Sequence, residues 1–240
     1  MSNVSISTNK LSIGYGSTVI QSDLTFSLNT GEMVCMLGPN GCGKSTLLRT
    51  LAGLQPALSG EYTHSDAKNI ALVLTERLSM DNTTVHDVVA LGRYPYSSFL
   101  DGLKKEDEAI IEDSLRQVGF ADTSVSQTFF NAHSDGEKQR ILIAKALAQQ
   151  TPIILLDEPT AHLDLPHRIL ILRLLRQLAH EQNKTILIST HELDLALALS
   201  DRILLMTPGK GIQLDTAENL RKSDAFTSAF GMDIFNPLGK

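Results

Sequence analysis

The sequence predicts an α/β fold built around a parallel sheet, and three observations lead to this prediction. Short apolar runs at residues 33–37, 153–156 and 185–188 have the length and composition of strands buried on both faces. A glycine-rich segment joins the first run to a helical pattern. From residue 152 onward strand and helix patterns alternate, as parallel βαβ units require.

Length and composition limit the kinds of protein that this chain can be. Its 240 residues, 42% of them apolar, suit one globular domain that carries an inserted lobe. No window of 18 uninterrupted apolar residues could cross a membrane, and the N-terminus has no secretion-signal pattern, so membrane association would need a partner. A net charge of −6 without a basic tract argues against a nucleic-acid partner. Cys35 and Cys42 are expected to be reduced thiols.

The remaining segments can be placed around this core. Residues 4–34 alternate short strand-like runs with turns and predict an antiparallel unit. Helical spacing of apolar residues predicts helices within 84–150 and over about 166–182. We therefore expect a single domain over 1–240, with a helical subdomain at about 77–150 inserted in the α/β core and a short closing segment over 201–240.

The segment from Gly38 to Thr46 fits the phosphate-loop pattern GxxxxGK[ST] and lies between a predicted strand and a predicted helix. Its glycines allow successive backbone N–H groups to point at phosphate oxygens, and the helix start adds partial positive charge. Lys44 would bind the β- and γ-phosphates, and Ser45 offers a hydroxyl to Mg²⁺. The nucleotide-binding residues predicted here are Gly38, Asn40, Gly41, Cys42, Gly43, Lys44, Ser45 and Thr46.

A second acidic element follows the apolar run at 153–156, where Asp157 and Glu158 come at the predicted strand end. A strand parallel to the first would bring Asp157 to the edge that carries the phosphate loop, where it could hold Mg²⁺. Glu158 would point to another face and could orient or deprotonate the attacking water.

Taken together, these motifs and their order along the chain resemble the ATP-binding cassette (ABC) family of transporter ATPases. Nearly the whole chain takes part in the resemblance. Its motifs are Tyr15, Gly38–Thr46, Ser134–Glu137 followed by Lys138-Gln139-Arg140, Asp157–Glu158, Ala161–Asp164 and His191. The resemblance implies a P-loop NTPase core with a RecA-like sheet, an N-terminal antiparallel β subdomain, an inserted helical subdomain, and ATP with Mg²⁺ as ligands.

Further residue roles are implied by the resemblance. Tyr15 would stack on adenine, Asp164 would lie in the loop linking two sites, and His191 would be the switch histidine. The family pattern implies a head-to-tail homodimer in which each ATP lies between one phosphate loop and the other subunit's Ser134 and Gly136. The residues support this, because a helix starting near Ser134 would present its hydroxyl and free N–H groups as a second anion site.

The sequence departs from the family pattern in two places. The signature, usually Leu-Ser-Gly-Gly-Gln, reads His133-Ser134-Asp135-Gly136-Glu137, and we expect its two carboxylates to weaken ATP-driven closure unless a nearby cation compensates. The family's loop glutamine is absent after the run at 70–74, where Thr75 and Glu76 follow. Either oxygen donor could approach the metal, or water could replace the contact, and the sequence does not choose among them.

The run from Thr84 to Tyr96 resembles cassettes of iron–siderophore, haem and cobalamin importers. The resemblance implies a permease that docks on the helical lobe, an indirect substrate-binding protein, and peripheral attachment at the cytoplasmic face of the membrane. Tyr94, Pro95, Tyr96 and Phe99 would form an apolar surface beside Arg93, or a loop packed on its own helix.

Iron chelates are the substrate that we expect. A soluble cassette ATPase, or one that is catalytically weakened, remains the alternative. A P-loop kinase or GTPase would lack the signature segment and the distal histidine.

Overall fold

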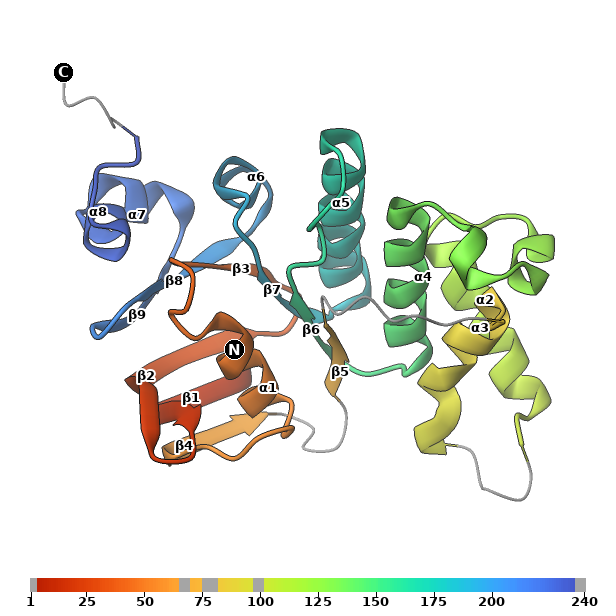
Figure 1. The fold of residues 1–240 in the computed structure, drawn as a ribbon, viewed down its shortest axis with the longest axis horizontal. Helices are drawn as coiled ribbons and strands as arrows, with labels where there is room; N and C mark the ends of the chain where they lie inside the picture. Colours follow the sequence, from red (N-terminus) through yellow and green to blue (C-terminus); the bar gives the residue numbers. More distant parts are fainter. Residues whose placement is uncertain (1–3, 65–69, 75–81, 97–101, 236–240) are drawn as a thin grey trace.

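A computed structural model describes residues 4–64, 70–74, 82–96 and 102–235, and its central feature is a six-stranded sheet (Figure 1). The strand order is β5-β6-β7-β3-β8-β9, in which the first five strands are parallel and β9 is antiparallel to β8. These strands are β3 (Met33–Leu37), β5 (Ile70–Val73), β6 (Ile153–Asp157), β7 (Thr185–Ser189), β8 (Arg202–Thr207) and β9 (Gly211–Asp215). Because parallel strands share one carboxyl edge, the phosphate loop after β3 and the acidic pair after β6 reach the same edge.

A second, antiparallel sheet has the order β2-β1-β4. It is made of β1 (Val4–Tyr15), β2 (Thr18–Asn29) and β4 (Ser59–His64). The first two strands are longer than the short runs that the sequence predicts, because register shifts interrupt their apolar alternation without ending the pairing. One such shift surrounds Lys10, whose backbone is left-handed.

The two faces of the central sheet bury alternate residues of each strand. Val34 and Met36 of β3 pack in one apolar cluster with α1 (Lys44–Leu51) and the antiparallel sheet. Cys35 and Leu37 of the same strand pack in the other cluster, with helices α5 (Leu165–Gln182) and α6 (Leu193–Leu199). Two short helices, α7 (Ala217–Lys222) and α8 (Ala225–Phe230), follow the last strand.

A group of helices lies between β5 and β6 in the sequence. These helices pack together at one end of the molecule, beside β5 and α5 (Figure 1). We call residues 84–148 the helical lobe. It contains α2 (Val85–Ala90), α3 (Lys105–Gln117), α4 (Asp135–Ala148) and the short 3₁₀ helices η1 (Leu91–Tyr96), η2 (Thr123–Gln127) and η3 (Phe130–Ala132). Helix α4 contacts both α2 and α3 within the lobe and also reaches β5 of the core.

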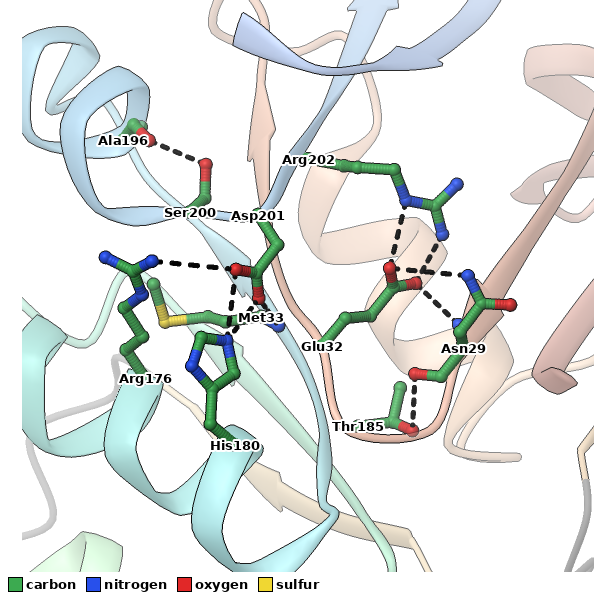
Figure 2. Close-up of polar contacts among 10 residues, drawn as sticks. All are labelled: Asn29, Glu32, Met33, Arg176, His180, Thr185, Ala196, Ser200, Asp201 and Arg202. Atoms are coloured by element: carbon green, nitrogen blue, oxygen red, sulfur yellow. Dashed lines mark hydrogen bonds and ion pairs between the residues drawn. The ribbon is translucent and has the colours of Figure 1, made fainter. Parts of the chain in front are cut away.

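The amino edge of the central sheet, opposite the phosphate loop, carries a polar network (Figure 2). Glu32 accepts hydrogen bonds from Asn29 and Arg202, and Asp201 accepts from the Met33 N–H and from His180. These contacts join β3, β8 and α5. Among the described residues, no helix is both long enough and apolar enough to cross a bilayer.

Candidate functional site

The segment between β3 and α1 forms a loop whose backbone few residues other than glycine adopt. Gly41 and Gly43 have φ values of 75° and 104°. A Cβ atom at Gly43 would also lie 3.0 Å from the Ile20 side chain. Gly43 is the N-cap of α1 and has no side chain to occupy the first N–H groups, so they remain available to an anion.

Lys44 is buried and its ammonium group lies against the loop itself. Its Nζ atom donates to the carbonyl oxygens of Gly38 at 2.9 Å and Pro39 at 3.2 Å. The loop is therefore folded around a positive charge, which an incoming phosphate could draw away from these two carbonyls.

Asp157 and Glu158 lie at the end of β6, as predicted, and both are held by Ser189 of the neighbouring strand. The hydroxyl of Ser189 donates to Oδ1 of Asp157. The N–H of Glu158 donates to the carbonyl oxygen of Ser189 at 3.1 Å and to its hydroxyl at 3.0 Å. Glu158 has a left-handed backbone with φ of 47°, so its side chain does not continue the alternation of side chains along β6.

His191 meets Glu158 across the ends of β6 and β7. Its Nε2 atom lies 2.6 Å from Oε1 of Glu158. The His191 side chain is 43% exposed and the Glu158 side chain is 32% exposed. The N–H of Thr190 donates to the carbonyl of Met36 in β3, the strand that leads into the phosphate loop. One edge of the sheet thus holds the phosphate loop, the acidic pair and the histidine.

Tyr15 ends β1 and is 52% exposed, beside the start of α1. Thr46 donates to the Tyr15 hydroxyl oxygen at 3.3 Å, which ties the ring to the phosphate-loop helix. Val19 is also exposed and pairs with Gly14 across the β1–β2 hairpin. This second apolar side chain had no motif to mark it in the sequence. Stacking of Tyr15 on adenine stays a prediction.

The signature segment begins α4, with Ser134 as its N-cap. The Glu137 carboxylate accepts from the Ser134 N–H at 3.0 Å and from its hydroxyl at 2.8 Å, and these bonds lower the pKa of Glu137. We expected Glu137 to face a phosphate, but here it turns back on Ser134 in a capping box. Ser134 itself is exposed at the surface. Its described hydrogen bonds do not reach the phosphate loop of the same chain.

Gly136 packs directly on the first turn of α5. A Cβ atom there would lie 2.7 Å from the imidazole of His167. That imidazole hydrogen-bonds to Asp164, the N-cap of α5, and this bond lowers the pKa of the Asp164 carboxyl. The signature segment and the linking loop are therefore connected through His167 within one chain.

Two residues of the site have roles that sequence reasoning missed. Gln21 of β2 is buried and donates to the carbonyl of Cys42 at 3.2 Å and to that of Thr207 at 3.0 Å, which steadies the phosphate loop. Ser189 was visible only as the residue two positions before His191. A glutamine in an alternating strand carries no sequence signal at all. The burial of Cys42 raises the pKa of its thiol.

Not every predicted surface residue lies at the surface. Arg93 is buried, with Nε 2.8 Å from Oδ1 of Asp107, and its guanidinium lies over the Tyr96 ring. It is therefore part of the lobe's packing, while Tyr94 stays 66% exposed. Thr75, Glu76 and Phe99 lie outside the described residues.

Comparison with known proteins places the chain among transport ATPases. Residues 21–161 match the family model described as ABC transporter. An uncharacterised ABC transporter ATP-binding protein of Methanocaldococcus jannaschii is 40% identical, over 96% of this chain and 83% of its own length. The iron(3+)-hydroxamate import ATP-binding protein FhuC of Bacillus subtilis is 38% identical, over 95% and 88%. The ferric enterobactin transport ATP-binding protein FepC of Escherichia coli is 33% identical, over 93% and 86%.

Solved structures give the same result. An ABC transporter assigned to the metal-chelate type, in an inward-facing conformation, matches with a TM-score of 0.87 and 31% identity, over 96% of this chain and 90% of its own. A nucleotide-free ATP-binding cassette that is 21% identical matches with a TM-score of 0.81, over 93% and 95%, and shares the fold. The predicted α/β fold, with its parallel core sheet, antiparallel β unit and helical insertion, is confirmed.

Proposed function

This chain belongs to the ABC transporter family of ATP-binding subunits, and we propose that it hydrolyses ATP to drive import of an iron chelate through a separate permease. The observation that carries this proposal is the carboxyl edge of the central sheet. There a phosphate loop with Lys44, the Asp157–Glu158 pair and His191 lie on adjoining strand ends. The names of the relatives in Bacillus subtilis and Escherichia coli support a ferric siderophore, with haem or cobalamin as the other choices.

The phosphates of ATP would bind to the loop between β3 and α1. Backbone N–H groups at the start of α1 would contact the phosphate oxygens, and Lys44 would exchange the carbonyls of Gly38 and Pro39 for them. The adenine would lie against Tyr15, whose hydroxyl is already tied to Thr46.

The residues of the site also fit Mg²⁺. Ser45 offers a hydroxyl oxygen and Asp157 a carboxylate oxygen, the hard donors that this ion prefers. Among the residues that the structure describes, no group of three His, Cys, Asp or Glu could hold a metal ion. In proteins Mg²⁺ is commonly bound by one or two carboxylates together with substrate phosphates. When bound, the ion neutralises charge on the β- and γ-phosphates.

Glu158 is the residue that we propose to activate the attacking water. It would accept the water proton as the water oxygen bonds to the γ-phosphorus, while the bond from that phosphorus to the β–γ bridging oxygen breaks and ADP leaves. His191 lies 2.6 Å from the Glu158 carboxylate and would hold it in this orientation. With ATP present, the imidazole could turn from Glu158 toward the γ-phosphate. Loss of that phosphate would then change the position of His191 and of the end of β7 that precedes it.

We propose that two copies form a head-to-tail dimer. Ser134 and Gly136 would contact the γ-phosphate held by Lys44 of the other subunit, and Asp164 would lie between the two sites. The exposed position of Ser134 at the start of α4 supports this arrangement. A helix start attracts anions through its free N–H groups and its dipole.

The permease would dock where the helical lobe meets β5. A cleft of about 200 Å³ opens there, and its lining is mostly apolar. The lining residues are Leu72, Val73, Leu74, Leu142, Lys145, Ala146 and Gln149. Tyr96 adjoins this cleft because its hydroxyl donates to the carbonyl of Gln149 at 2.7 Å. We therefore propose residues 77–150 as the coupling subdomain, with the chain held at the cytoplasmic face of the membrane and a substrate-binding protein on the other side.

One observation favours the alternative of a weakened ATPase. The Ser134 hydroxyl is engaged by Glu137, so ATP must compete for it when the dimer closes. The cassette alone would then be slow and would depend on its permease for full activity.

Glu158→Gln provides the test. We expect a fall in ATP hydrolysis of about 10²–10⁴-fold, the usual contribution of a general base, with ATP binding retained. Thr227→Ala on α8 serves as a control distant from the site. Equal hydrolysis by wild type and Glu158→Gln would contradict the proposal.

Transport needs a second test. Cells whose chromosomal copy carries Glu158→Gln should lose uptake of a radiolabelled ferric siderophore, and the wild-type chain should co-purify with a multi-helix membrane protein. Loss of cobalamin uptake alone would keep the ATPase and change the substrate. Full ferric-siderophore and cobalamin uptake would contradict the importer assignment.

A further inference from the structure

We propose that Ser189 is a positioning residue that fixes Asp157 and Glu158 relative to each other, an inference that rests on the proposed ATPase function. Ser189 ends β7 and pairs in register with Asp157 of β6. Its side chain is fully buried. A single hydroxyl thus lies between the carboxylate proposed for the metal and the residue proposed as the base.

Elementary hydrogen-bond chemistry determines what this hydroxyl does. The Glu158 N–H can only donate, so the Ser189 oxygen accepts from it at 3.0 Å. The hydroxyl proton is then available to Asp157, whose ionised carboxylate can only accept. The donor and one of the two acceptor lone pairs are used, and the hydroxyl proton cannot rotate away without breaking the bond to Asp157.

The bond to Asp157 orients a metal-binding carboxylate. A carboxylate at a strand end can rotate about its terminal torsion, which has a broad energy well. A buried donor on Oδ1 selects one rotation and so determines which lone pairs face the ion. Outer partners of this kind commonly tune metal affinity by 10- to 100-fold.

The bond to Glu158 holds a backbone conformation that is costly for a residue with a Cβ atom. The φ of 47° places Glu158 in the left-handed region. Its N–H is shared between the carbonyl and the hydroxyl of Ser189, so both acceptors come from one residue. Because the side chain then points to His191, a shift of this backbone would also separate the carboxylate from the imidazole.

A buried serine can also serve packing alone, and Ser114 supplies the comparison. It is buried in α3, and its hydroxyl donates to the carbonyl of Ile110 at 2.7 Å, within the same helix. Ser114→Ala therefore makes the same chemical change as Ser189→Ala at a place far from the strand ends.

The experiment compares wild type, Ser189→Ala, Ser189→Cys and Ser114→Ala as full-length proteins. It measures kcat and KM for ATP, binding of a fluorescent ATP analogue without metal, and the Mg²⁺ concentration that half-saturates the metal-dependent increase in that binding. Thermal melts report folding.

For Ser189→Ala we expect kcat to fall by about 10- to 100-fold, the range that a small misplacement of reacting groups produces. The half-saturating Mg²⁺ concentration should rise by about 10-fold. Metal-free nucleotide binding should stay within about twofold, because the phosphate loop is intact. Ser189→Cys, a weaker donor of similar size, should lie between, and Ser114→Ala should match wild type in all three values.

A Ser189→Ala variant with the kcat and Mg²⁺ dependence of Ser114→Ala would overturn the proposal. If Ser189→Ala does not fold, the same comparison on Ser189→Cys decides, and wild-type values there overturn it equally. Absence of Mg²⁺-dependent hydrolysis in the wild type would instead overturn the proposed function.

Discussion

At the edge of the central sheet where β3, β6 and β7 finish, the pair of Glu158 and His191 remains partly open to solvent. At the edge where β3 and β8 begin, the Glu32 carboxylate is buried within a network of polar contacts (Figure 2). The side chains of Glu158 and His191 at the first edge are about a third or more exposed, and the described contact of each carboxylate or imidazole is with the other. Glu32 at the second edge is buried, and both of its carboxylate oxygens accept hydrogen bonds from Arg202.

The difference shows how one sheet separates binding from stability. At the amino edge each acceptor is paired inside the protein, so removal of a partner should cost folding free energy. At the carboxyl edge, the left-handed backbone of Glu158 opposes stability, while Lys44 is held by backbone carbonyls that a ligand can replace. The predictions below test whether the two edges can be disturbed independently.

The largest expected effect is that of Lys44→Ala at the carboxyl edge. We expect kcat/KM for ATP to fall by about 10³-fold, or about 4 kcal/mol, because a charge that stabilises the transferred phosphoryl group is lost. The matched control is Lys184→Ala, since Lys184 also donates to a backbone carbonyl, that of Thr151 at 2.9 Å, but precedes β7 at the amino edge. Steady-state kinetics and thermal melts measure both. Equal loss of activity per folded molecule in the two variants would break the comparison.

Arg202→Met should have the next largest effect, on stability. It leaves the buried Glu32 carboxylate without its cation, and we expect the free energy of unfolding to fall by about 2–3 kcal/mol. ATP hydrolysis per folded molecule should not change. Urea denaturation checks this, with Arg116→Met, an exposed helix pair with Asp113, expected to change stability by less than about 0.5 kcal/mol. A double Glu32→Leu/Arg202→Met variant should recover part of the loss.

Gly136→Ala tests the signature segment, a part of the binding machinery that only a dimer would use. The new methyl group would lie 2.7 Å from the His167 ring, so either this ring or the signature end of α4 must shift. We expect ATP-dependent dimerisation in a Glu158→Gln background to weaken by about 10-fold, or about 1.4 kcal/mol, while ATP binding by the monomer is unchanged. Analytical ultracentrifugation measures this, and a Gly136→Ala/His167→Ala double variant should restore dimerisation. Unaltered dimerisation in Gly136→Ala would argue against the head-to-tail arrangement.

Glu137→Gln should have the smallest effect and should depend on pH. The folded-state pKa of Glu137 is lowered by the Ser134 hydroxyl, so its contribution to stability is present above the ordinary value of 4.5 and is lost as pH falls through the folded pKa. At pH 7 we expect the variant to lose about 0.5 kcal/mol of stability and to be insensitive to acid at this position. Denaturation at pH 7 measures the loss of stability, and the same measurement at pH 4 shows whether the variant still responds to acid. ATP-dependent dimerisation should strengthen, since a carboxylate is removed beside the γ-phosphate.

Much of the fold could be predicted from local patterns. The runs at 153–156 and 185–188 became β6 and β7 almost residue for residue, because uninterrupted apolar runs of that length suit strands buried on both faces. The β1–β2 hairpin was harder. Its two 12-residue strands are interrupted by register shifts, which hide the alternation on which a sequence prediction depends.

The site likewise contains residues that local patterns predict and residues whose roles depend on contacts in the fold. The phosphate-loop pattern and the acidic pair were visible because each is contiguous in the chain. From the family pattern, Glu137 was expected to bring negative charge toward a phosphate. In the structure its side chain turns back to Ser134, three residues earlier, and caps the helix. Arg93 was expected beside a surface cluster, but its long side chain reaches inward to Asp107.

By itself, the sequence determined the chemistry that depends on neighbouring residues. Glycine spacing in 38–46 decides which backbone angles are available, and Lys44 and Ser45, which follow the last of these glycines, decide what the loop can bind. Which distant groups come into contact depends on the three-dimensional fold. Ser189 contacts Asp157 across 32 positions of sequence, and that meeting depends on the register of β6 against β7, which is set by packing on both faces of the sheet.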